Sequence, residues 1–249
     1  MKKEYINEFA WSKIFDFLKQ QKNIYLMQET VCKNFIEAVF WMARTGAQWR
    51  ELPEKYGKWN SVFKRFNQWS IKGIWLKLLE FCSDDPDLES IMLDSTIVRA
   101  HACAAGYGDQ NIQGLGRSRG GFTSKIHVKV DALGNVLKLL ITGGQRHDIT
   151  QAPELISDTK NANIIADTAY GSRTIREQIR NQNCIDIIPS RVNSKEPVDY
   201  DKHLYKERSQ VECFFSKLKY FRRIFSRFDK SARNFSSFVC FVGAILWLR

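Results

Sequence analysis

The order of strand-like and helix-like segments after residue 90 is the feature that most constrains the fold of this chain. Three runs of strand length, rich in apolar and β-branched residues, come first, at 91–98, 124–131 and 135–142. A turn at Ala132-Leu133-Gly134 joins the last two as a hairpin. Helices and strands then alternate: a helix near 149–158, a strand at 163–167, a helix near 172–182, a strand at 184–189 and a long helix from about 204. This order predicts a mixed sheet flanked by helices.

Three acidic residues lie at informative points of this pattern. Asp94 interrupts the first strand run, Asp167 ends the fourth, and Glu212 lies on the last helix. Because neighbouring strands can bring side chains at matching heights together, we expect these carboxylates to converge. Three carboxylates without a histidine or cysteine ligand nearby suit a hard divalent cation such as magnesium. On a chain with a net charge of +11, such a site indicates phosphoryl chemistry on nucleic acid.

The segment around Glu212 has a strong helical pattern. Four polar residues are spaced by three, four and seven positions: Tyr205, Arg208, Glu212 and Lys219. At about 100° per residue, this spacing places all four on one helix face. An apolar stripe beside that face predicts that the helix docks on the sheet; it consists of Val211, Phe214, Phe215 and Leu218. A plain surface helix with charge pairs four residues apart fits the same spacing.

Composition narrows the class of protein. The positive net charge favours a protein with a polyanionic partner over a basic protein that its charge merely keeps soluble. The hydrophobic content of 44% is ordinary for a globular protein. The six cysteines are scattered without a C-x-x-C pair, so we expect free thiols in a reducing cytoplasm and no zinc site. Charges interrupt the amino-terminal apolar residues, and the apolar run at 238–249 is too short to span a bilayer. We therefore expect no secretory signal, no membrane span and a buried closing helix.

An aromatic amino-terminal unit precedes the predicted sheet. Six of the seven tryptophans lie within the first 75 residues. Helical periodicity at 31–43 and 60–69 flanks a turn-rich connection and predicts a helix-turn-helix-like DNA-binding module. Basic residues lie in or near these helices: Lys58, Lys64, Arg65 and Lys72. A helical bundle with solvated lysines is the alternative. The acidic stretch at 83–90 is the best linker candidate.

Two other segments allow more than one interpretation. The glycine-rich stretch at 114–121 lacks the strand before it and the helix after it that a dinucleotide-binding loop requires. With Arg117 and Arg119, it is either a mobile loop that contacts DNA backbone or a flexible surface connection. His147 and Asp148 follow the third strand, and we interpret them as a turn cap or structural pair in preference to a direct catalytic pair.

Several of these segments resemble a known family. The four polar residues from Tyr205 to Lys219 match the tyrosine–arginine–glutamate–lysine signature of bacterial insertion-sequence transposases. The catalytic core of the insertion-sequence family 5 group is similar to LDSTIVRAH (93–101), GRSRGGFTSKIHVKVDALGN (116–135) and ADTAYGS (166–172). The amino-terminal domain of that group is similar to RTGAQWRELPEKYGKWNSVFKRFNQW (44–69). His147 and Asp148 also match, and the resemblance covers nearly the whole chain.

The resemblance implies a fold and an activity. The fold would be a ribonuclease-H-like α/β catalytic domain at 91–249, preceded by an all-α, helix-turn-helix-like domain at 1–82 and a linker at 83–90. The activity would be that of an Asp–Asp–Glu (DDE) transposase, which binds the terminal inverted repeats of its element, cleaves there and joins the ends to target DNA. The enzyme would act on double-stranded DNA as a homodimer or larger assembly, without a nucleotide cofactor. It would work in the bacterial cytoplasm, at the nucleoid.

The resemblance also implies roles for particular residues. Asp94, Asp167 and Glu212 would form the catalytic triad and hold two magnesium ions, for which manganese would substitute. The DNA-contacting residues would be Arg117, Arg119, Arg208, Lys219, Lys64 and Arg65. Lys219 lies about 10 Å along the helix from Glu212, within reach of a DNA phosphate.

Two rival functions remain open at this point. A structure-selective nuclease of the same fold would share the three carboxylates but would cut without joining strands. An inactive DNA-binding remnant, acting as a repressor, would retain the amino-terminal domain and the charge alone. The intact triad disfavours the remnant, and the family motifs disfavour a general nuclease.

Overall fold

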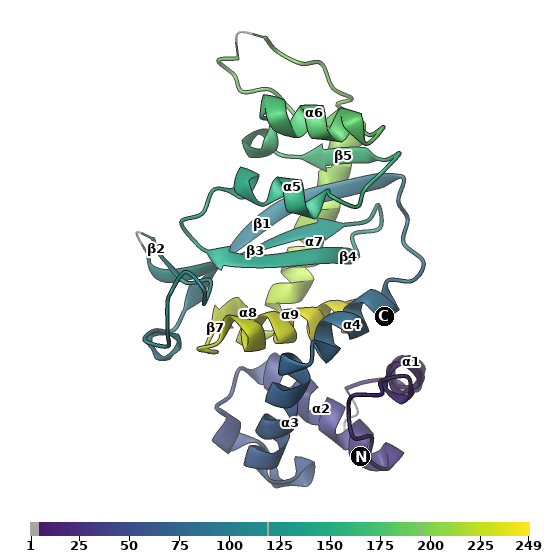
Figure 1. Cartoon of the computed structure of the whole chain (residues 1–249), viewed down its shortest axis with the longest axis vertical. Coiled ribbons are helices and arrows are strands. Elements are labelled where there is room, and N and C mark those ends of the chain that lie inside the picture. Colours follow the sequence, from purple (N-terminus) through teal and green to yellow (C-terminus); the bar gives the residue numbers. More distant parts are fainter. Residues whose placement is uncertain (1–4, 119, 195) are drawn as a thin grey trace. The chain divides into compact units, whose positions relative to one another are not determined.

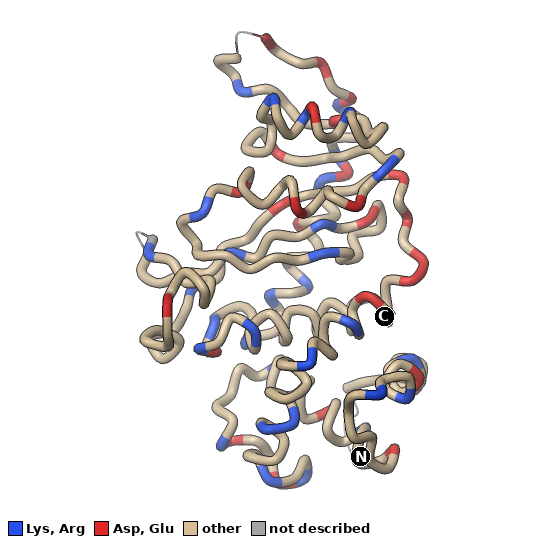
Figure 2. The backbone as a smooth tube through the Cα atoms, in the orientation of Figure 1, with Lys and Arg blue, Asp and Glu red and all other residues tan. Residues whose placement is uncertain are grey.

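The computed structural model describes residues 5–118, 120–194 and 196–249, which form two compact units (Figure 1). The helical unit contains the described residues up to Asp84, together with Ala100–Gly108 and Leu218–Arg249. The sheet unit contains Asp85–Arg99 and the described residues of Asp109–Lys217. The first boundary falls inside the predicted linker at 83–90, a segment whose acidic positions are marked in Figure 2.

The helical unit is built from helices and short turns. Its elements are α1 (Glu8–Lys19), α2 (Glu29–Thr45), η1 (Trp49–Glu51), η2 (Glu54–Tyr56), α3 (Trp59–Ile71), α4 (Ile74–Cys82), η3 (Ala102–Ala104), α8 (Arg222–Phe225), the short strand β7 (Ser226–Arg227) and α9 (Ala232–Trp247). The helices predicted at 31–43 and 60–69 are therefore confirmed as α2 and α3. Two 3-10 turns lie between them, so their connection is longer than the turn of three or four residues in a helix-turn-helix motif.

Local sequence explains where these helices begin and end. Asn7 caps α1, because its side-chain oxygen accepts a hydrogen bond of 2.8 Å from the Ala10 N–H. Gly46 ends α2 in the left-handed conformation, at φ 67°, and its N–H donates to the Met42 carbonyl. Glycine adopts this backbone conformation at little steric cost, which stops the helix at this point.

Helix α9 completes the aromatic core of the helical unit. The Phe238 ring stacks on Phe66 of α3 at a centroid distance of 4.3 Å, and Phe241 meets Trp75 of α4 edge-on at 5.3 Å. The predicted buried closing helix is thus confirmed. By its contacts α9 belongs to the helical unit, whereas the sequence predicts a catalytic domain over 91–249. The large buried aromatic rings of α3 and α4 provide the apolar surface that α9 covers.

The sheet unit contains six strands and three α-helices among the described residues. The strands are β1 (Ser90–Ala100), β2 (Gly116–Ser118), β3 (Gly121–Val130), β4 (Val136–Gly143), β5 (Asn163–Ala166) and β6 (Ile185–Ile187). The helices are α5 (Ala152–Leu155), α6 (Arg173–Asn181) and α7 (Ser209–Lys219), with 3-10 turns η4 (Asp148–Thr150), η5 (Thr168–Tyr170) and η6 (Leu204–Arg208). The helix expected near 149–158 is shorter than predicted. A 3-10 turn precedes it, and Pro153 is tolerated only in the first turn of a helix.

Strand order defines the fold of this unit. The order is β4-β3-β1-β5-β6, in which β3 is antiparallel to β1 and β4, whereas β5 is parallel to both β1 and β6. Three antiparallel strands followed by two parallel strands with intervening helices form the expected ribonuclease-H-like α/β fold.

Helices cover both faces of this sheet (Figure 1). Helices α5 and α6 contribute Leu155 and Ile179 to a core that also contains Leu93 of β1. Helix α7 runs along the opposite face. Because side chains alternate along a strand, Asp94 points away from the core of Leu93 and toward the α7 face.

The six cysteines are free, as predicted; Cys103 and Cys213 are exposed and the others are buried. In the described part of the chain, no helix is long and apolar enough to cross a membrane.

Candidate active site

Asp94 and Asp167 occupy matching positions on neighbouring parallel strands. Leu93 of β1 pairs with Ala166 of β5, so the next residue on each strand is one of the two aspartates. Adjacent strands lie about 4.8 Å apart, which brings both carboxylates to one edge of the sheet. Asp167 caps the turn that follows β5, since its Oδ1 accepts a 2.9 Å hydrogen bond from the Ala169 N–H. The structure therefore brings together the first two carboxylates that the sequence analysis selected.

The Asp94 carboxyl lies in a crowded and largely buried position. Its side chain is 18% exposed, and its Oδ1 accepts a 2.7 Å hydrogen bond from the Ser95 N–H. The pKa of Asp94 is raised to about 6, chiefly by burial. The Ser95 hydrogen bond and Arg208 lower the pKa, and the nearby charges of Asp167 and Asp148 raise it. Ionising this carboxyl is therefore costly unless a cation lies beside it.

Arg208 lies between Asp94 and Glu212. Its Nη1 donates to Asp94 Oδ2 at 3.1 Å, and its Nη2 donates to Glu212 Oε1 at 2.5 Å. Glu212 is 56% exposed, one helical turn after Arg208, on the opposite side of the guanidinium from Asp94. The apolar stripe predicted to dock α7 is confirmed, because Val211, Phe214, Phe215 and Leu218 are all buried.

A fourth carboxylate, Asp148, belongs to the same cluster. Its Oδ1 accepts a 2.6 Å hydrogen bond from Ser95 Oγ and lies 2.9 Å from Lys125 Nζ. The Nδ1 of the fully buried His127 is 3.6 Å from the same oxygen, and its Nε2 is 2.8 Å from Thr142 Oγ1. Burial lowers the pKa of His127 to about 4, so this imidazole is neutral at pH 7.

The sequence analysis treated Asp148 as a turn cap or structural partner and did not place it beside Asp94. The alternation of side chains between the two faces of β1 could have indicated the contact between Ser95 and Asp148. It turns Ser95 to the opposite face from Asp94, toward the turn that carries Asp148.

Two tyrosines also lie near these carboxylates. Tyr170, in the turn after Asp167, is buried, and its pKa is raised by burial and then by the charges of Asp148, Asp94 and Asp167. Tyr205 is half-buried and stacks edge-on against Tyr200 at a centroid distance of 5.4 Å. Burial raises its pKa as well. Both phenols are therefore protonated at neutral pH.

The carboxylates fit an oxygen-preferring divalent cation. Asp94, Asp167 and Glu212 offer only oxygen donors. A cation would offset the cost of ionising Asp94, whose pKa is raised first by burial and then by the charges of Asp167 and Asp148. Among the described residues, no set of three histidine, cysteine or acidic side chains is already spaced as a metal site. The Arg208 guanidinium lies between two of the three carboxylates, Asp94 and Glu212, and balances their charge.

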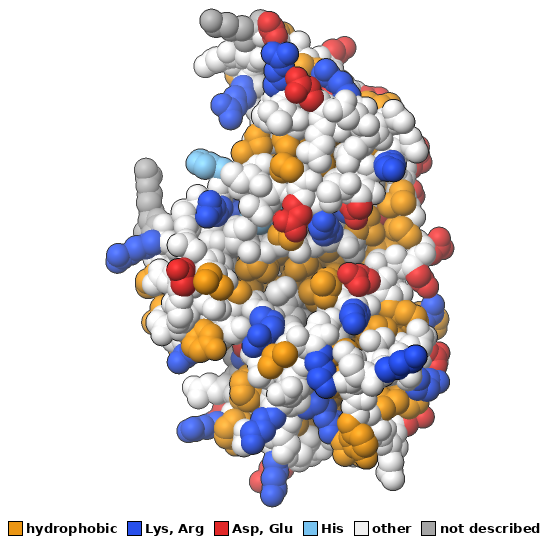
Figure 3. All heavy atoms as spheres, in the orientation of Figure 1, with side chains coloured by type: hydrophobic (Ala, Val, Ile, Leu, Met, Phe, Trp, Pro, Cys, Tyr) orange, Lys and Arg blue, Asp and Glu red, His pale blue; other side chains and the backbone are white. Residues whose placement is uncertain are grey.

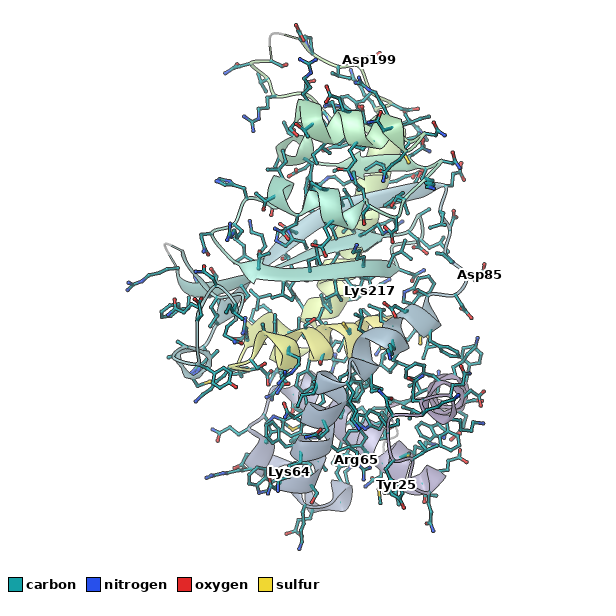
Figure 4. All side chains as sticks on the ribbon, viewed as in Figure 1. Tyr25, Lys64, Arg65, Asp85, Asp199 and Lys217 are labelled. Carbon is teal, nitrogen blue, oxygen red and sulfur yellow. The ribbon has the colours of Figure 1, made fainter. Side chains whose placement is uncertain are left out.

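The other residues selected from the sequence lie on other elements or outside the described chain. Arg117 is exposed on β2, which pairs with β3, so the glycine-rich stretch is partly a hairpin. Arg119 lies outside the described residues. Lys64 is exposed on α3, whereas Arg65 is half-buried with its Cζ 5.0 Å from the centre of the Phe35 ring (Figure 4). Lys219, at the end of α7, is half-buried, and burial lowers its pKa.

Fold and site together define a ribonuclease-H-like protein with a carboxylate cluster suited to a divalent cation. The chain belongs to the DDE transposases: the family described as "Transposase DDE domain" matches residues 85–247. The family described as "Putative transposase of IS4/5 family" matches residues 6–79. Both matches confirm the family resemblance.

Two curated proteins and one solved structure are similar to this chain. A Brucella ovis protein named "Putative transposase for insertion sequence element IS6501" is 39% identical over 132 residues, which cover 51% of this chain and 99% of the relative. The Sinorhizobium fredii protein y4sN is 46% identical over 72 residues, covering 29% of this chain and 58% of that protein. A solved structure of the piggyBac transposase synaptic complex with hairpin DNA is 12% identical, with a TM-score of 0.45. That match covers 76% of this chain and 48% of the piggyBac chain.

Proposed function

We propose that this transposase binds the terminal inverted repeats of its insertion sequence and catalyses metal-dependent DNA strand cleavage and strand transfer. The observation that carries the proposal is the juxtaposition of Asp94 on β1 and Asp167 at the end of the paired parallel strand β5, with Glu212 linked to Asp94 through Arg208. Its partners would be double-stranded element ends and target DNA. Because both ends must be processed together, the active species would be a homodimer or larger assembly.

Each residue of the cluster would have a distinct task. Asp94, Asp167 and Glu212 would hold two magnesium ions, which would supply an activated water or 3′-hydroxyl and stabilise the leaving oxygen; manganese would substitute. Arg208 would leave the carboxylates and place its guanidinium on a DNA phosphate, for which its planar fork is suited. Asp148 would position the strand residue next to Asp94 through its hydrogen bond with Ser95. We place this activity in the bacterial cytoplasm, at the nucleoid.

The test uses the full chain, the DNA that borders its reading frame, a target plasmid and magnesium. Asp94→Asn, Asp167→Asn and Glu212→Gln should abolish cleavage yet leave binding of labelled element ends nearly intact, because these side chains would hold metal and would not read bases. Glu154→Gln, an exposed carboxylate on α5, is the matched control and should cleave normally.

Three outcomes would contradict parts of this proposal. Cutting without joining would indicate a nuclease, and binding without cutting by the wild type would indicate a repressor remnant. A triad variant that cuts at the wild-type rate would remove that residue from the metal site.

A further inference from the structure

A large cavity opens on the sheet unit close to the carboxylate cluster. Its volume is about 1350 Å³, and its lining comes from three segments: Ile149 after Asp148, residues 171–180 around the start of α6, and the described residues of the loop 190–198. The loop is closed at its base, where the Val198 N–H donates to Ser190 Oγ at 2.8 Å. This cavity is called the arginine cavity below.

The topology of the sheet places the arginine cavity on the same edge as the carboxylates. The segment from Asp167 to α6 leaves the carboxyl end of β5, and the loop leaves the carboxyl end of the parallel neighbour β6. Ligands of such sheets bind outside the carboxyl ends of the parallel strands. Ser172 follows Asp167 by five residues, a stretch that spans at most about 17 Å. Phosphates of one DNA strand advance 3.4 Å per nucleotide along the axis, so the cavity begins within about five nucleotides of Asp167.

The lining is cationic and rich in hydrogen-bond donors. Four arginines line the cavity against two acids, Glu177 and Glu196: Arg173, Arg176, Arg180 and Arg191. Figure 2 marks basic positions along α6 and on the loop, and Figure 3 shows basic side chains with acidic ones between them at this end of the sheet unit. Arg176 is buried and committed to the fold, because it binds Asp186 and the Ile188 carbonyl.

The remaining three guanidiniums are accessible to a ligand. Arg173 is 93% exposed in a pair with Glu177, and Arg180 is 61% exposed at 3.7 Å from Asp186. The Arg173–Glu177 pair is exposed and therefore weak, and Asp186, which is only 8% exposed, keeps the buried Arg176 as a partner. A phosphate can therefore bind either exposed guanidinium at little cost. The exposed Arg191 forms no ion pair with any described residue. Serine and asparagine side chains supply further donors at Ser172, Ser190 and Asn193, whereas the Ser194 hydroxyl already donates to the Glu196 carbonyl.

We infer that the arginine cavity holds the DNA strand adjacent to the cleavage point, with its phosphates on Arg173, Arg180 and Arg191. This inference rests on the proposed function, which places the scissile phosphate at Asp94 and Asp167. The size of the cavity favours a polymer, because sites for small molecules usually enclose about 300–1,000 Å³ and have mostly apolar walls. The strand would cross the start of α6 and continue under the loop, so these residues extend the DNA interface beyond the signature on α7.

The experiment measures how the affinity of the full chain for DNA depends on salt. A short fluorescent duplex containing one inverted repeat is titrated with the wild type, Arg191→Ala, Arg191→Lys and Lys160→Ala at several salt concentrations, in a chelator. Lys160 is an exposed cation just before β5, at the opposite end of that strand from Asp167, and is the matched control. Removing one phosphate contact should reduce the magnitude of the slope of log K against log salt by about 0.9. We expect this reduction for Arg191→Ala, with recovery in Arg191→Lys and no change in Lys160→Ala.

The outcomes separate this inference from the proposed function. An unchanged slope for Arg191→Ala, or an equal loss for Lys160→Ala, overturns the arginine cavity as a DNA site; normal magnesium-dependent cleavage by the wild type would then leave the function standing. If the slope is reduced for Arg191→Ala but the wild type binds DNA and never cleaves it, the arginine cavity is supported as a DNA site and the proposed function is contradicted. A wild type that fails to bind the duplex contradicts both. Thermal melting of each variant confirms that it is folded.

Discussion

Arg208 donates a 3.1 Å hydrogen bond to Asp94, a residue far from it in the sequence. In the absence of metal, the Arg208 guanidinium supplies positive charge beside the Asp94 carboxylate. It therefore connects the start of α7 to the centre of the sheet as well as balancing charge.

Replacing Arg208 should destabilise the metal-free protein. Arg208→Ala leaves the largely buried Asp94 without its cation, and we expect a loss of about 1–2 kcal/mol in the free energy of unfolding at pH 7. Urea denaturation in a chelator measures the loss. The control is Arg173→Ala, which removes a 93% exposed pair of the same i, i+4 spacing and should cost less than about 0.5 kcal/mol. Equal losses in the two variants would show that the Arg208 pair has no special structural role.

Asp94 and His127 should give the metal-free protein opposing pH dependences. The folded state raises the pKa of Asp94 to about 6 and therefore holds its proton more tightly, so stability falls as the pH rises from about 4 to 6. The folded state lowers the pKa of His127 to about 4, so stability rises with pH from about 4 to 6.5. The charged neighbours are Asp148, Asp167 and Arg208 for Asp94, and Asp148 and Lys125 for His127. In the wild type the two effects largely cancel.

Single substitutions should reveal each effect. As the pH rises from about 4 to 6, the free energy of unfolding of Asp94→Asn should increase relative to that of the wild type by up to about 3 kcal/mol. The reason is that this variant lacks the falling Asp94 contribution and retains the rising His127 contribution. The free energy of unfolding of His127→Gln should decrease relative to that of the wild type by a similar amount across the same range, because only the Asp94 contribution remains. Urea unfolding of the three proteins at several pH values, with a chelator present, provides the comparison. Parallel stability curves for all three would contradict the assigned pKa shifts.

Lys219 should be required for cleavage, and Lys217 should not. Lys219 is half-buried, its pKa is lowered by burial, and it has no acidic partner among the described residues, which leaves its ammonium available for a DNA phosphate. Lys219→Ala should remain folded but cleave at least about tenfold more slowly, a loss of about 1.4 kcal/mol of transition-state stabilisation. Lys219→Arg should recover only part of the rate, because the guanidinium has a different reach and geometry.

Lys217 is exposed two residues earlier on α7 and provides a matched alanine variant (Figure 4). Cleavage rates and thermal melting of the four proteins decide the role of Lys219. Normal cleavage by Lys219→Ala would leave this lysine a surface charge.

Truncating the α9 aromatic contact should destabilise the helical unit. Phe238→Ala removes a fully buried ring that stacks on Phe66 and should cost about 3–5 kcal/mol, the usual range for emptying such a site. The exposed Phe225 serves as the control, since Phe225→Ala should change stability by less than about 0.5 kcal/mol. Chemical denaturation followed by tryptophan fluorescence reports on this unit. A small effect of Phe238→Ala would contradict the packing of α9 against α3.

Strand patterns indicated that Asp94 and Asp167 could meet, because Asp94 interrupts the first strand run and Asp167 ends the fourth. The parallel pairing of these two strands in the structure sets both residues at one height. The contact between Arg208 and Asp94 could not be predicted in this way. Helical spacing indicates that Arg208 reaches Glu212, but its distance to β1 depends on how η6 and α7 dock on the sheet. The contacts of Asp148 could not be predicted for a similar reason. A single residue in a turn has no periodicity, and its partners Ser95 and Lys125 lie on β1 and β3.

The position of α9 shows a further limit of sequence patterns. The apolar sequence of α9 predicts that the helix is buried, but it does not predict which elements pack against the helix. Phe238 and Phe241 pack on aromatic residues of α3 and α4, so the C-terminal helix belongs to the same unit as α1 to α4, near the opposite end of the chain.

The pairing of Phe66 with Phe238 has a consequence for synthesis on the ribosome. The residues between them, including the entire sheet unit, must be translated before the α3 ring receives its partner. At about 5–20 residues per second, α2, α3 and α4 would wait on the order of ten to thirty seconds with an incomplete core. During that interval the faces of Phe66 and Trp75 that α9 later covers stay open to solvent or a chaperone, which makes the newly made amino-terminal segment prone to aggregate.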